Sequence, residues 1–215
     1  MIVEVEQYYT GKDMLWMFSR GDRSVCAALL PVVAGEFNVR FDFNGGDKLN
    51  LYYNPTDTRF GTSLRERLSY KVFEDERLVS IITNEYKKCK GLFQSYEYAV
   101  MEFNGDKYCL YEVGLWKDGL FLCLYQNDRL VAIAEKELTT VNFKGKYHVY
   151  IEDETCIEPL FLMMIRYDIT KYAVFDEVAI HSKKIKLVKT VQKELNAKFD
   201  PEFIERVKAQ EGITY

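Results

Sequence analysis

Apolar and polar residues alternate in short runs from the start of the chain to about residue 151, and turn residues separate these runs. The clearest run is 36–43, in which every second side chain is apolar: Phe37, Val39, Phe41 and Phe43. Alternation of this kind predicts strands with one buried and one solvated face, because successive side chains of a strand point to opposite sides. A turn at 44–47 leads into the next run, 49–53, which predicts a hairpin. The runs indicate about twelve strands in a meandering antiparallel sheet or barrel.

One strand-turn-strand unit occurs twice in the sequence. Residues 70–82 and 123–134 share an Arg-Leu-Val-x-Ile segment, whose Arg77 and Arg129 are 52 positions apart. A further Tyr-rich strand follows each copy, at 96–100 and at 147–151. Two interpretations stand side by side: two similar halves close one sheet, or common turn chemistry makes two hairpins alike by chance.

The pattern changes at Glu158-Pro159, where proline suits the first turn of a helix. From Leu160 to Ile180 apolar residues occupy nearly every side of the expected helix. A helix that is apolar all round must be buried all round. We therefore expect residues 1–180 to form one mainly β domain, a closed antiparallel barrel around a hydrophobic helix at 158–180.

Residues 181–215 form the basic part of an acidic protein. They hold eight Lys or Arg against five Asp or Glu, whereas the whole chain has a net charge of -4. Lysines at 183, 184, 186, 189 and 193 are expected to lie opposite an apolar stripe that includes Val191 and Leu195, which predicts a helix. Asp200-Pro201 is a good start for a second short helix. We expect a helical appendage outside the barrel.

Composition and charge narrow the class of protein. The 215 residues are 48% hydrophobic and 15% aromatic, which is typical of a folded, strand-rich chain. A sequence pI of 5.4 disfavours nonspecific nucleic-acid binding. Five cysteines without a Cys-x-x-Cys pair, and an N-terminus without a signal pattern, indicate a cytoplasmic protein. We expect no transmembrane segment, because five charged residues, among them Arg166 and Asp168, interrupt the longest apolar stretch.

The strand count, the repeated unit and the final apolar helix together resemble the tubby C-terminal-like superfamily, which includes LURP-one-related proteins, phospholipid scramblases and many small bacterial proteins. The resemblance is best over residues 70–180 and is carried by 125–136, 147–153 and 160–168. Residues 1–65 match only in their strand-like rhythm. The resemblance implies a closed barrel around a hydrophobic helix, no catalytic chemistry in most members, and membrane-lipid association in the better understood branches. Tubby-type domains bind phosphoinositides through surface Lys and Arg, but none of those positions aligns with this chain.

Catalytic and metal-binding motifs are missing from the sequence. His148 and His181 have no pattern of cysteines or carboxylates around them, so a structural role is favoured. Gly11-Lys12 lacks the earlier glycine of a phosphate-binding loop, and residues 42–47 lack the ligand spacing of a calcium loop. A barrel filled by its own helix also leaves little room for a substrate. We therefore expect a non-enzymatic protein with no cofactor and no metal.

Two groups of lysines are the candidate binding residues. Lys87, Lys88 and Lys90 precede Leu92 and Phe93, so they are candidates for contact with anionic lipid head groups, with the apolar pair entering the interface. The second group is Lys183, Lys184 and Lys186 in the basic tail. The alternatives are a solvated loop and an ordinary helix packed on the barrel.

Two further hypotheses remain open at this stage. The chain is either a lipid-binding protein, peripheral at the membrane, or an interaction scaffold that binds a protein partner or a second copy through its C-terminal helices. Cys89 lies among these lysines, where a reactive thiol is one interpretation and an inert cysteine the simpler one.

Overall fold

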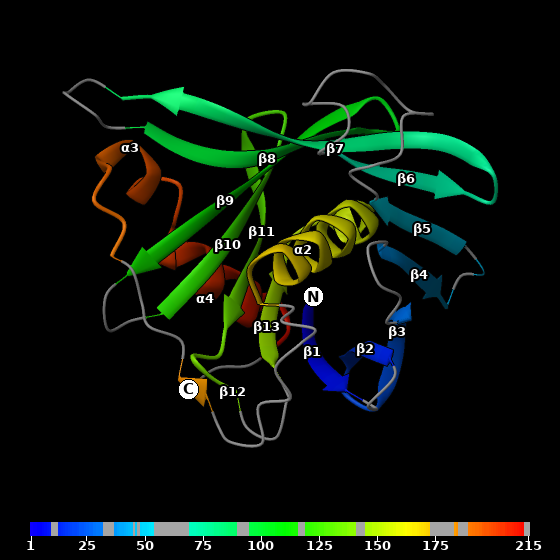
Figure 1. Ribbon diagram of the computed structural model, residues 1–215. Helices are drawn as coiled ribbons and strands as arrows, with labels where there is room; N and C mark the ends of the chain where they lie inside the picture. The colour runs from blue at the N-terminus through cyan, green and yellow to red at the C-terminus, as the bar shows by residue number, and fades with distance from the viewer. Residues whose placement is uncertain are drawn as a thin grey trace.

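A computed structural model describes residues 1–9, 13–31, 37–44, 46, 48–53, 69–89, 95–115, 119–140, 145–172, 183–184 and 189–212. The dominant feature is a closed, twelve-stranded antiparallel barrel (Figure 1). Its strands are β1 (Ile2–Tyr9), β2 (Asp13–Arg20), β3 (Arg23–Pro31), β4 (Phe37–Phe43), β5 (Lys48–Tyr53), β6 (Tyr70–Glu74), β7 (Arg77–Lys88), β8 (Ser95–Phe103), β9 (Asp106–Leu115), β10 (Gly119–Gln126), β11 (Arg129–Lys136) and β13 (Lys146–Ile151). The predicted fold class is confirmed.

Neighbours in the barrel are also neighbours in sequence, with one exception. β1 closes the barrel by pairing with β2 on one side and with β13 on the other, where Ile2 lies opposite Tyr150. The first five strands are therefore integral parts of the barrel, although only their rhythm matched the family pattern. A separate pair of two-residue strands, β12 (Thr139–Thr140) and β14 (Lys183–Lys184), lies outside the barrel.

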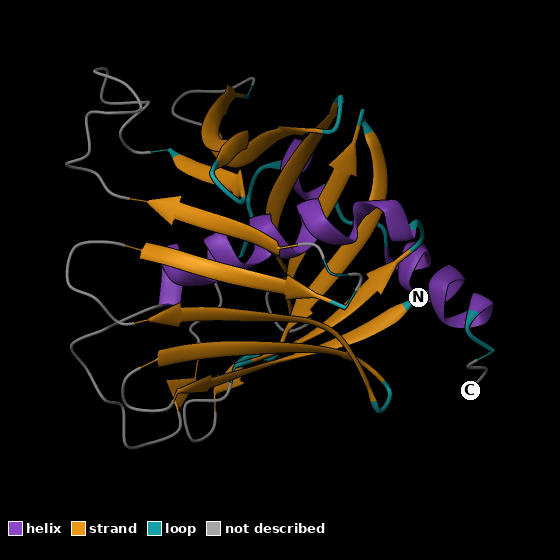
Figure 2. Cartoon of the chain, turned by 90° about the vertical axis from the view of Figure 1, so that its right-hand side faces the viewer, coloured by secondary structure: helices purple, strands orange, loops and turns teal. Residues whose placement is uncertain are grey.

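The barrel interior is filled by α2 (Ile157–Tyr172), which follows the short 3-10 helix η1 (Glu154–Cys156) and runs lengthwise through the barrel (Figure 2). Every residue from Pro159 to Ile169 is buried, as the all-round apolar sequence requires. Phe161 stacks on Phe18, with ring centroids 4.0 Å apart, and its ring centroid lies 6.4 Å from that of Phe43. The predicted central helix is confirmed over its described part, and residues 173–180 lie outside the described residues.

The repeated hairpin is present in the structure, and it occurs a third time. The β6–β7 and β10–β11 hairpins each shift register by one residue at equivalent places, after Val72 and after Leu124. The β2–β3 hairpin shifts in the same way after Phe18. The extra residue of each bulge is a valine two positions after a turn arginine, and these pairs are Arg23 and Val25, Arg77 and Val79, and Arg129 and Val131. Bulges bend and twist the strand that carries them, so a recurring bulge helps the sheet to close.

In the first part of the tail, residues 181–215, the described residues do not form the helix that the sequence predicts. Lys183 and Lys184 form strand β14, and residues 189–192 are not helical, so the predicted helix is wrong at these positions. Pairing with Thr139 and Thr140 gives the lysine backbone its hydrogen bonds, and β-branched Thr190 and Val191 are poor helix formers. Two helices do lie outside the barrel, α3 (Lys193–Asn196) and α4 (Pro201–Gln210). Asp200 caps α4 by accepting a hydrogen bond from the Glu202 amide at 3.0 Å, as predicted.

Both helices pack on the outer surface of the barrel. Strand β10 is buried on both faces from Gly119 to Leu124, because one face meets α2 and the other meets the tail. This outer core combines barrel residues with tail residues, namely Tyr96, Tyr111, Val113, Phe121, Cys123, Ile133, Tyr150, Leu195, Phe203, Ile204 and Val207. The second short helix predicted after Asp200 is therefore present as α4, and it packs on the barrel.

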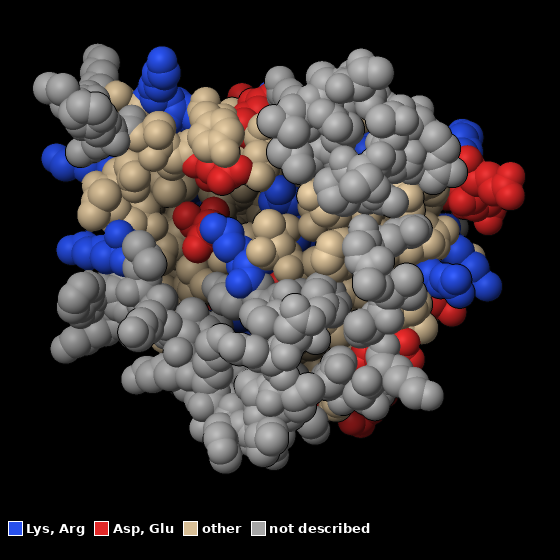
Figure 3. Space-filling view, viewed as in Figure 1, with Lys and Arg blue, Asp and Glu red and all other residues tan. Residues whose placement is uncertain are grey.

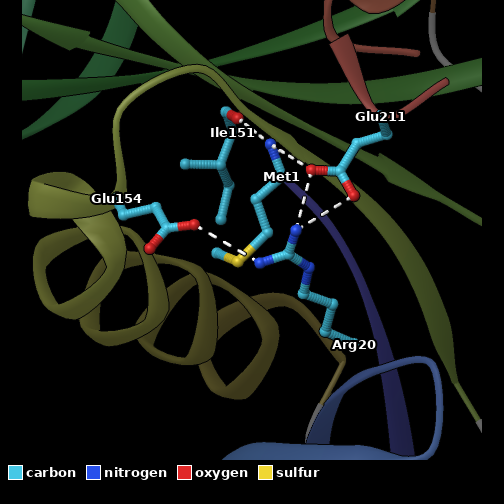
Figure 4. A network of polar contacts seen from close by, with 5 residues as sticks. All are labelled: Met1, Arg20, Ile151, Glu154 and Glu211. Carbon is cyan, nitrogen blue, oxygen red and sulfur yellow. Dashed lines mark hydrogen bonds and ion pairs between the residues drawn. The ribbon is translucent and has the colours of Figure 1, made fainter.

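The end of α4 is also held by polar contacts (Figure 4). Glu211 accepts hydrogen bonds from Arg20 of β2 at 3.1 and 3.2 Å, and it lies 3.4 Å from the amino group of Met1. That amino group also donates to the Ile151 carbonyl at 2.6 Å. Arg20 reaches Glu154 at 3.5 Å, so one arginine links β2, η1 and the end of α4.

Candidate functional site

The β7–β8 hairpin extends past the barrel wall. Strand β7 pairs with β6 only up to Ile82, and β8 pairs with β9 only from Ala99 onward. Beyond these residues the two strands pair with each other as far as Lys88 and Ser95. The result is a two-stranded ribbon that projects from the body of the protein, at the upper left of Figure 1.

The two faces of the ribbon differ. On one face, Lys87 forms an ion pair with Glu194 of α3, with Nζ and Oε2 3.1 Å apart. Gln192 donates to the Ser95 carbonyl at 3.3 Å, which also fixes α3 beside the ribbon. The hydrogen bond with Glu194 raises the pKa of Lys87. The tail therefore holds one of the predicted lysines.

The other face of the ribbon continues the face of β7 whose side chains point into the barrel. Asn84, Tyr86 and Lys88 follow buried Ile82 at every second position, so their side chains share its face. Tyr86 is 71% exposed and Lys88 is exposed. The charge of nearby Glu97 on β8, together with its hydrogen bond, raises the pKa of Tyr86.

The predicted lysines do not form one group. Lys183 and Lys184 lie on β14, at the bottom of Figure 1 and far from the ribbon. Lys90 and Lys186 lie outside the described residues. Figure 3 shows acidic and basic groups interspersed over the described part of this face, with separate basic groups along the margin over the end of β7 and α3.

A polar cluster lies where the ribbon leaves the barrel. Arg166, near the end of α2, is only 8% exposed, and its Nη2 donates to Asn84 Oδ1 at 2.6 Å. Its guanidinium carbon is 5.4 Å from the ring centroid of Tyr70, which stacks on Tyr53 at 4.6 Å. Thr170 accepts from the Tyr70 hydroxyl at 3.2 Å, because its own hydroxyl proton goes to the Arg166 carbonyl at 2.7 Å. We call Arg166, Asn84, Tyr53, Tyr70 and Thr170 the Arg166 cluster.

A second charged residue of α2 lies deeper in the barrel. Asp168 accepts hydrogen bonds from Lys136 at 2.8 Å, from the Tyr147 hydroxyl at 2.5 Å and from the Trp16 indole at 3.1 Å. The Lys136 ammonium also lies 4.0 Å from the centroid of the Tyr147 ring. All four side chains are buried, so this group connects α2 to strands β2, β11 and β13 and does not meet solvent.

Neither group was predicted as a site from the sequence. Arg166 and Asp168 were noted there only as charges that interrupt an apolar stretch. Their partners lie 82 residues away for Arg166, and 32 and 152 residues away for Asp168. The available signal was the presence of charges in a helix that must be buried on all sides, since a buried charge requires partners.

The cysteines and histidines give no further centre. All five cysteines are unpaired thiols, and burial raises the pKa of Cys26, Cys123 and Cys156, the last to about 12. Cys89 is half-buried against the outer core. His148 lies 3.4 Å from Glu137, and His181 lies outside the described residues. Within the described part of the chain, no three His, Cys, Asp or Glu side chains are grouped as metal ligands.

Comparisons with protein-family models, with curated proteins and with solved protein structures give no match to this chain. Among the described residues, no helix is long and apolar enough to cross a membrane.

Proposed function

We propose that this chain is a non-enzymatic, cytoplasmic binding module that attaches peripherally to anionic membrane surfaces through the end of the β7–β8 ribbon. The observation that carries the proposal is the position of Tyr86 and Lys88 on a projecting ribbon, on the face that α3 does not cover. Exposed aromatic and basic side chains together suit the boundary between head groups and acyl chains. In the sequence Lys90, Leu92 and Phe93 follow directly.

The filled interior supports a binding role over an enzymatic one. Small-molecule enzymes use a concave pocket, and barrels of this kind offer one only when their interior is open. Here α2 occupies the interior with side chains that are fully buried from Leu160 to Ile165. A module of this kind acts through its outer surface and its rims.

Co-sedimentation with vesicles tests the proposal. The intact protein is expected to bind phosphatidylcholine vesicles that contain phosphatidylserine and not to bind vesicles of pure phosphatidylcholine. Added salt should dissociate the protein from the vesicles, because it screens the charges. Lys88→Glu removes one favourable charge and adds one unfavourable charge at the surface, each worth about 1 kcal/mol, so it is expected to weaken binding about thirtyfold. Tyr86→Ser is expected to weaken it as well.

The matched control is Lys107→Glu. Lys107 is also exposed, but it lies on β9 beside the β8–β9 turn, at the opposite end of β8 from the ribbon. Equal binding by wild type, Lys88→Glu and Lys107→Glu would contradict the proposal. Removing the tail is a poor test, because it uncovers the outer core.

We also propose membership of the tubby C-terminal-like superfamily. A closed twelve-stranded antiparallel barrel around a buried helix supports this, as does the recurrence of one bulged hairpin. Solved structures of close homologues of this chain would test it. A homologue whose strand order differs from the order found here would contradict it.

A protein-interaction role is the second candidate. Leu78 and Ile81 are 42% and 40% exposed on β7, and with Tyr86 they are three of the four large exposed apolar side chains among the described residues. The C-terminal helices, proposed first for this role, use their apolar faces on the barrel. Light scattering of the wild type and of Ile81→Lys tests self-association through this surface. The hypothesis requires the wild type to form dimers and Ile81→Lys to remain monomeric.

A further inference from the structure

The Arg166 cluster contains a buried positive charge that makes no direct ion pair with a described residue. No carboxylate of the described residues lies within ion-pair distance of Arg166, and its guanidinium donates a hydrogen bond to the neutral side-chain oxygen of Asn84. Its Nε is buried with no hydrogen-bond partner among the residues described. Buried cations are normally paired, and buried N–H groups are normally bonded. The guanidinium therefore has unused binding capacity.

Partial compensation explains how the fold holds this charge. The Tyr70 ring lies against the guanidinium, and cation–π contact stabilises a cation. The amide nitrogen of Asn84 donates a hydrogen bond to the Glu97 carboxylate, so Asn84 bridges the guanidinium and a negatively charged group. Burial nevertheless lowers the pKa of Arg166, which indicates that these neutral partners do not replace the lost water.

The cluster borders solvent instead of lying deep in the core. Tyr53 and Asn84 are half-buried, and Thr170 and Glu97 are exposed. The cluster therefore lies at the rim of the barrel, where its outer members meet solvent although Arg166 itself is only 8% exposed. Asp168, two residues further along α2, differs in this respect, because buried partners surround it.

We propose that Arg166 is the centre of an oxyanion-binding site at the rim of the barrel, which takes the phosphate or carboxylate group of a small molecule or of a lipid. A guanidinium binds such groups through two parallel N–H donors, and Nε with an Nη group supplies that geometry. The Tyr53–Tyr70 stack forms an aromatic wall beside it. This inference does not rest on the proposed membrane role, which uses the ribbon.

Nitrogen-detected or ¹H–¹⁵N NMR of the arginine side chains tests the proposal directly. Inorganic phosphate is titrated into the intact protein, with chloride at equal ionic strength as the reference, to remove screening effects. The Nε–H resonance of Arg166 is expected to shift saturably with phosphate and to stay in place with chloride. A third arm uses phosphatidylcholine vesicles with and without phosphatidic acid, which separates a membrane-borne phosphate from a free one.

Variants supply the second readout. Arg166→Gln is expected to weaken phosphate binding at least tenfold, because a charge-assisted pair is lost. Arg129→Gln is the control, since Arg129 is exposed and pairs with Glu152 at 3.0 Å. Binding in either the free or the vesicle arm that depends on Arg166 supports the site. No saturable shift in any arm, or unchanged binding by Arg166→Gln, would overturn it, and the wild-type resonance decides the matter if the variant fails to fold.

Discussion

Lys136 and Asp168 form an ion pair of 2.8 Å inside the barrel, with both side chains almost completely withdrawn from solvent. The pair joins the central helix to strand β11, and Tyr147 and Trp16 complete the hydrogen bonding of the carboxylate. Hydrophobic packing alone is tolerant of rotation and sliding, whereas a bonded pair accepts one position. We interpret this pair as the contact that sets the register of α2 within the barrel.

Asp168→Asn tests that interpretation. The substitution keeps the shape of the side chain but removes the buried negative charge that lies 2.8 Å from the Lys136 ammonium, so the free energy of unfolding should fall by about 3–5 kcal/mol. Urea denaturation measures it. Asp168→Leu combined with Lys136→Met removes both charges and should lose less than Asp168→Asn, and the opposite order would contradict the argument.

Phe203→Ala tests whether the tail belongs to the folded body. Phe203 of α4 is fully buried in the outer core, so its truncation should cost about 3–5 kcal/mol of unfolding free energy. Glu205→Ala on the exposed side of the same helix should cost under about 0.5 kcal/mol. If the two variants unfold at the same denaturant concentration, the tail contributes little to the barrel.

Glycine at position 128, in the turn between β10 and β11, should stabilise the protein. Asn127 and Asp128 both have positive φ angles, 46° and 68°, which side chains tolerate poorly. Asp128→Gly should therefore raise the unfolding free energy by up to about 1 kcal/mol, measured by thermal denaturation. Asn127→Gly should not help, because the Asn127 side chain bonds Asp106 at 2.6 Å and the Lys107 amide at 3.1 Å.

Stability should fall in alkali through the buried thiols. Burial raises the pKa of Cys156 from an ordinary 9.0 to about 12 in the folded protein, so between these values the folded state holds a proton that the unfolded state releases. Stability from this group is complete below pH 9 and declines as pH rises towards 12, by up to about 1.4 kcal/mol per pH unit. Denaturation of Cys156→Ala at pH 8 and pH 10.5 should show a smaller decline than wild type.

The sequence was sufficient for the elements whose environment is set by local pattern. Alternation in residues 37–43 and the apolar stretch 160–169 each predict burial without knowledge of the partner, and both are confirmed. The strand at Lys183–Lys184 could not be predicted, because its hydrogen bonds depend on Thr139 and Thr140, over 40 residues away. Long-range pairing overrides local helical preference there.

The Arg166 cluster shows the same limit for the candidate site. Its members come from β5, β6, β7 and α2, and no spacing in the chain links Tyr53 and Asn84 to Arg166. The lysines, in contrast, form a visible run, but Lys87 is held by Glu194 from the tail. The third bulged hairpin was missed because Arg23-Ser24-Val25 replaces the Arg-Leu-Val segment that the other two copies share.

The order of the elements along the chain constrains how the protein is made. The barrel closes only when β1 meets β13, and Ile2 and Tyr150 are 148 positions apart. The helix that fills it is synthesised after every barrel strand. While the ribosome is still adding residues 1–150, the inward-facing side chains have no helix to cover them, and unpaired strand edges favour aggregation. Closure of this barrel around its helix is therefore a late event in synthesis, because it requires both β13 and α2 to have been made.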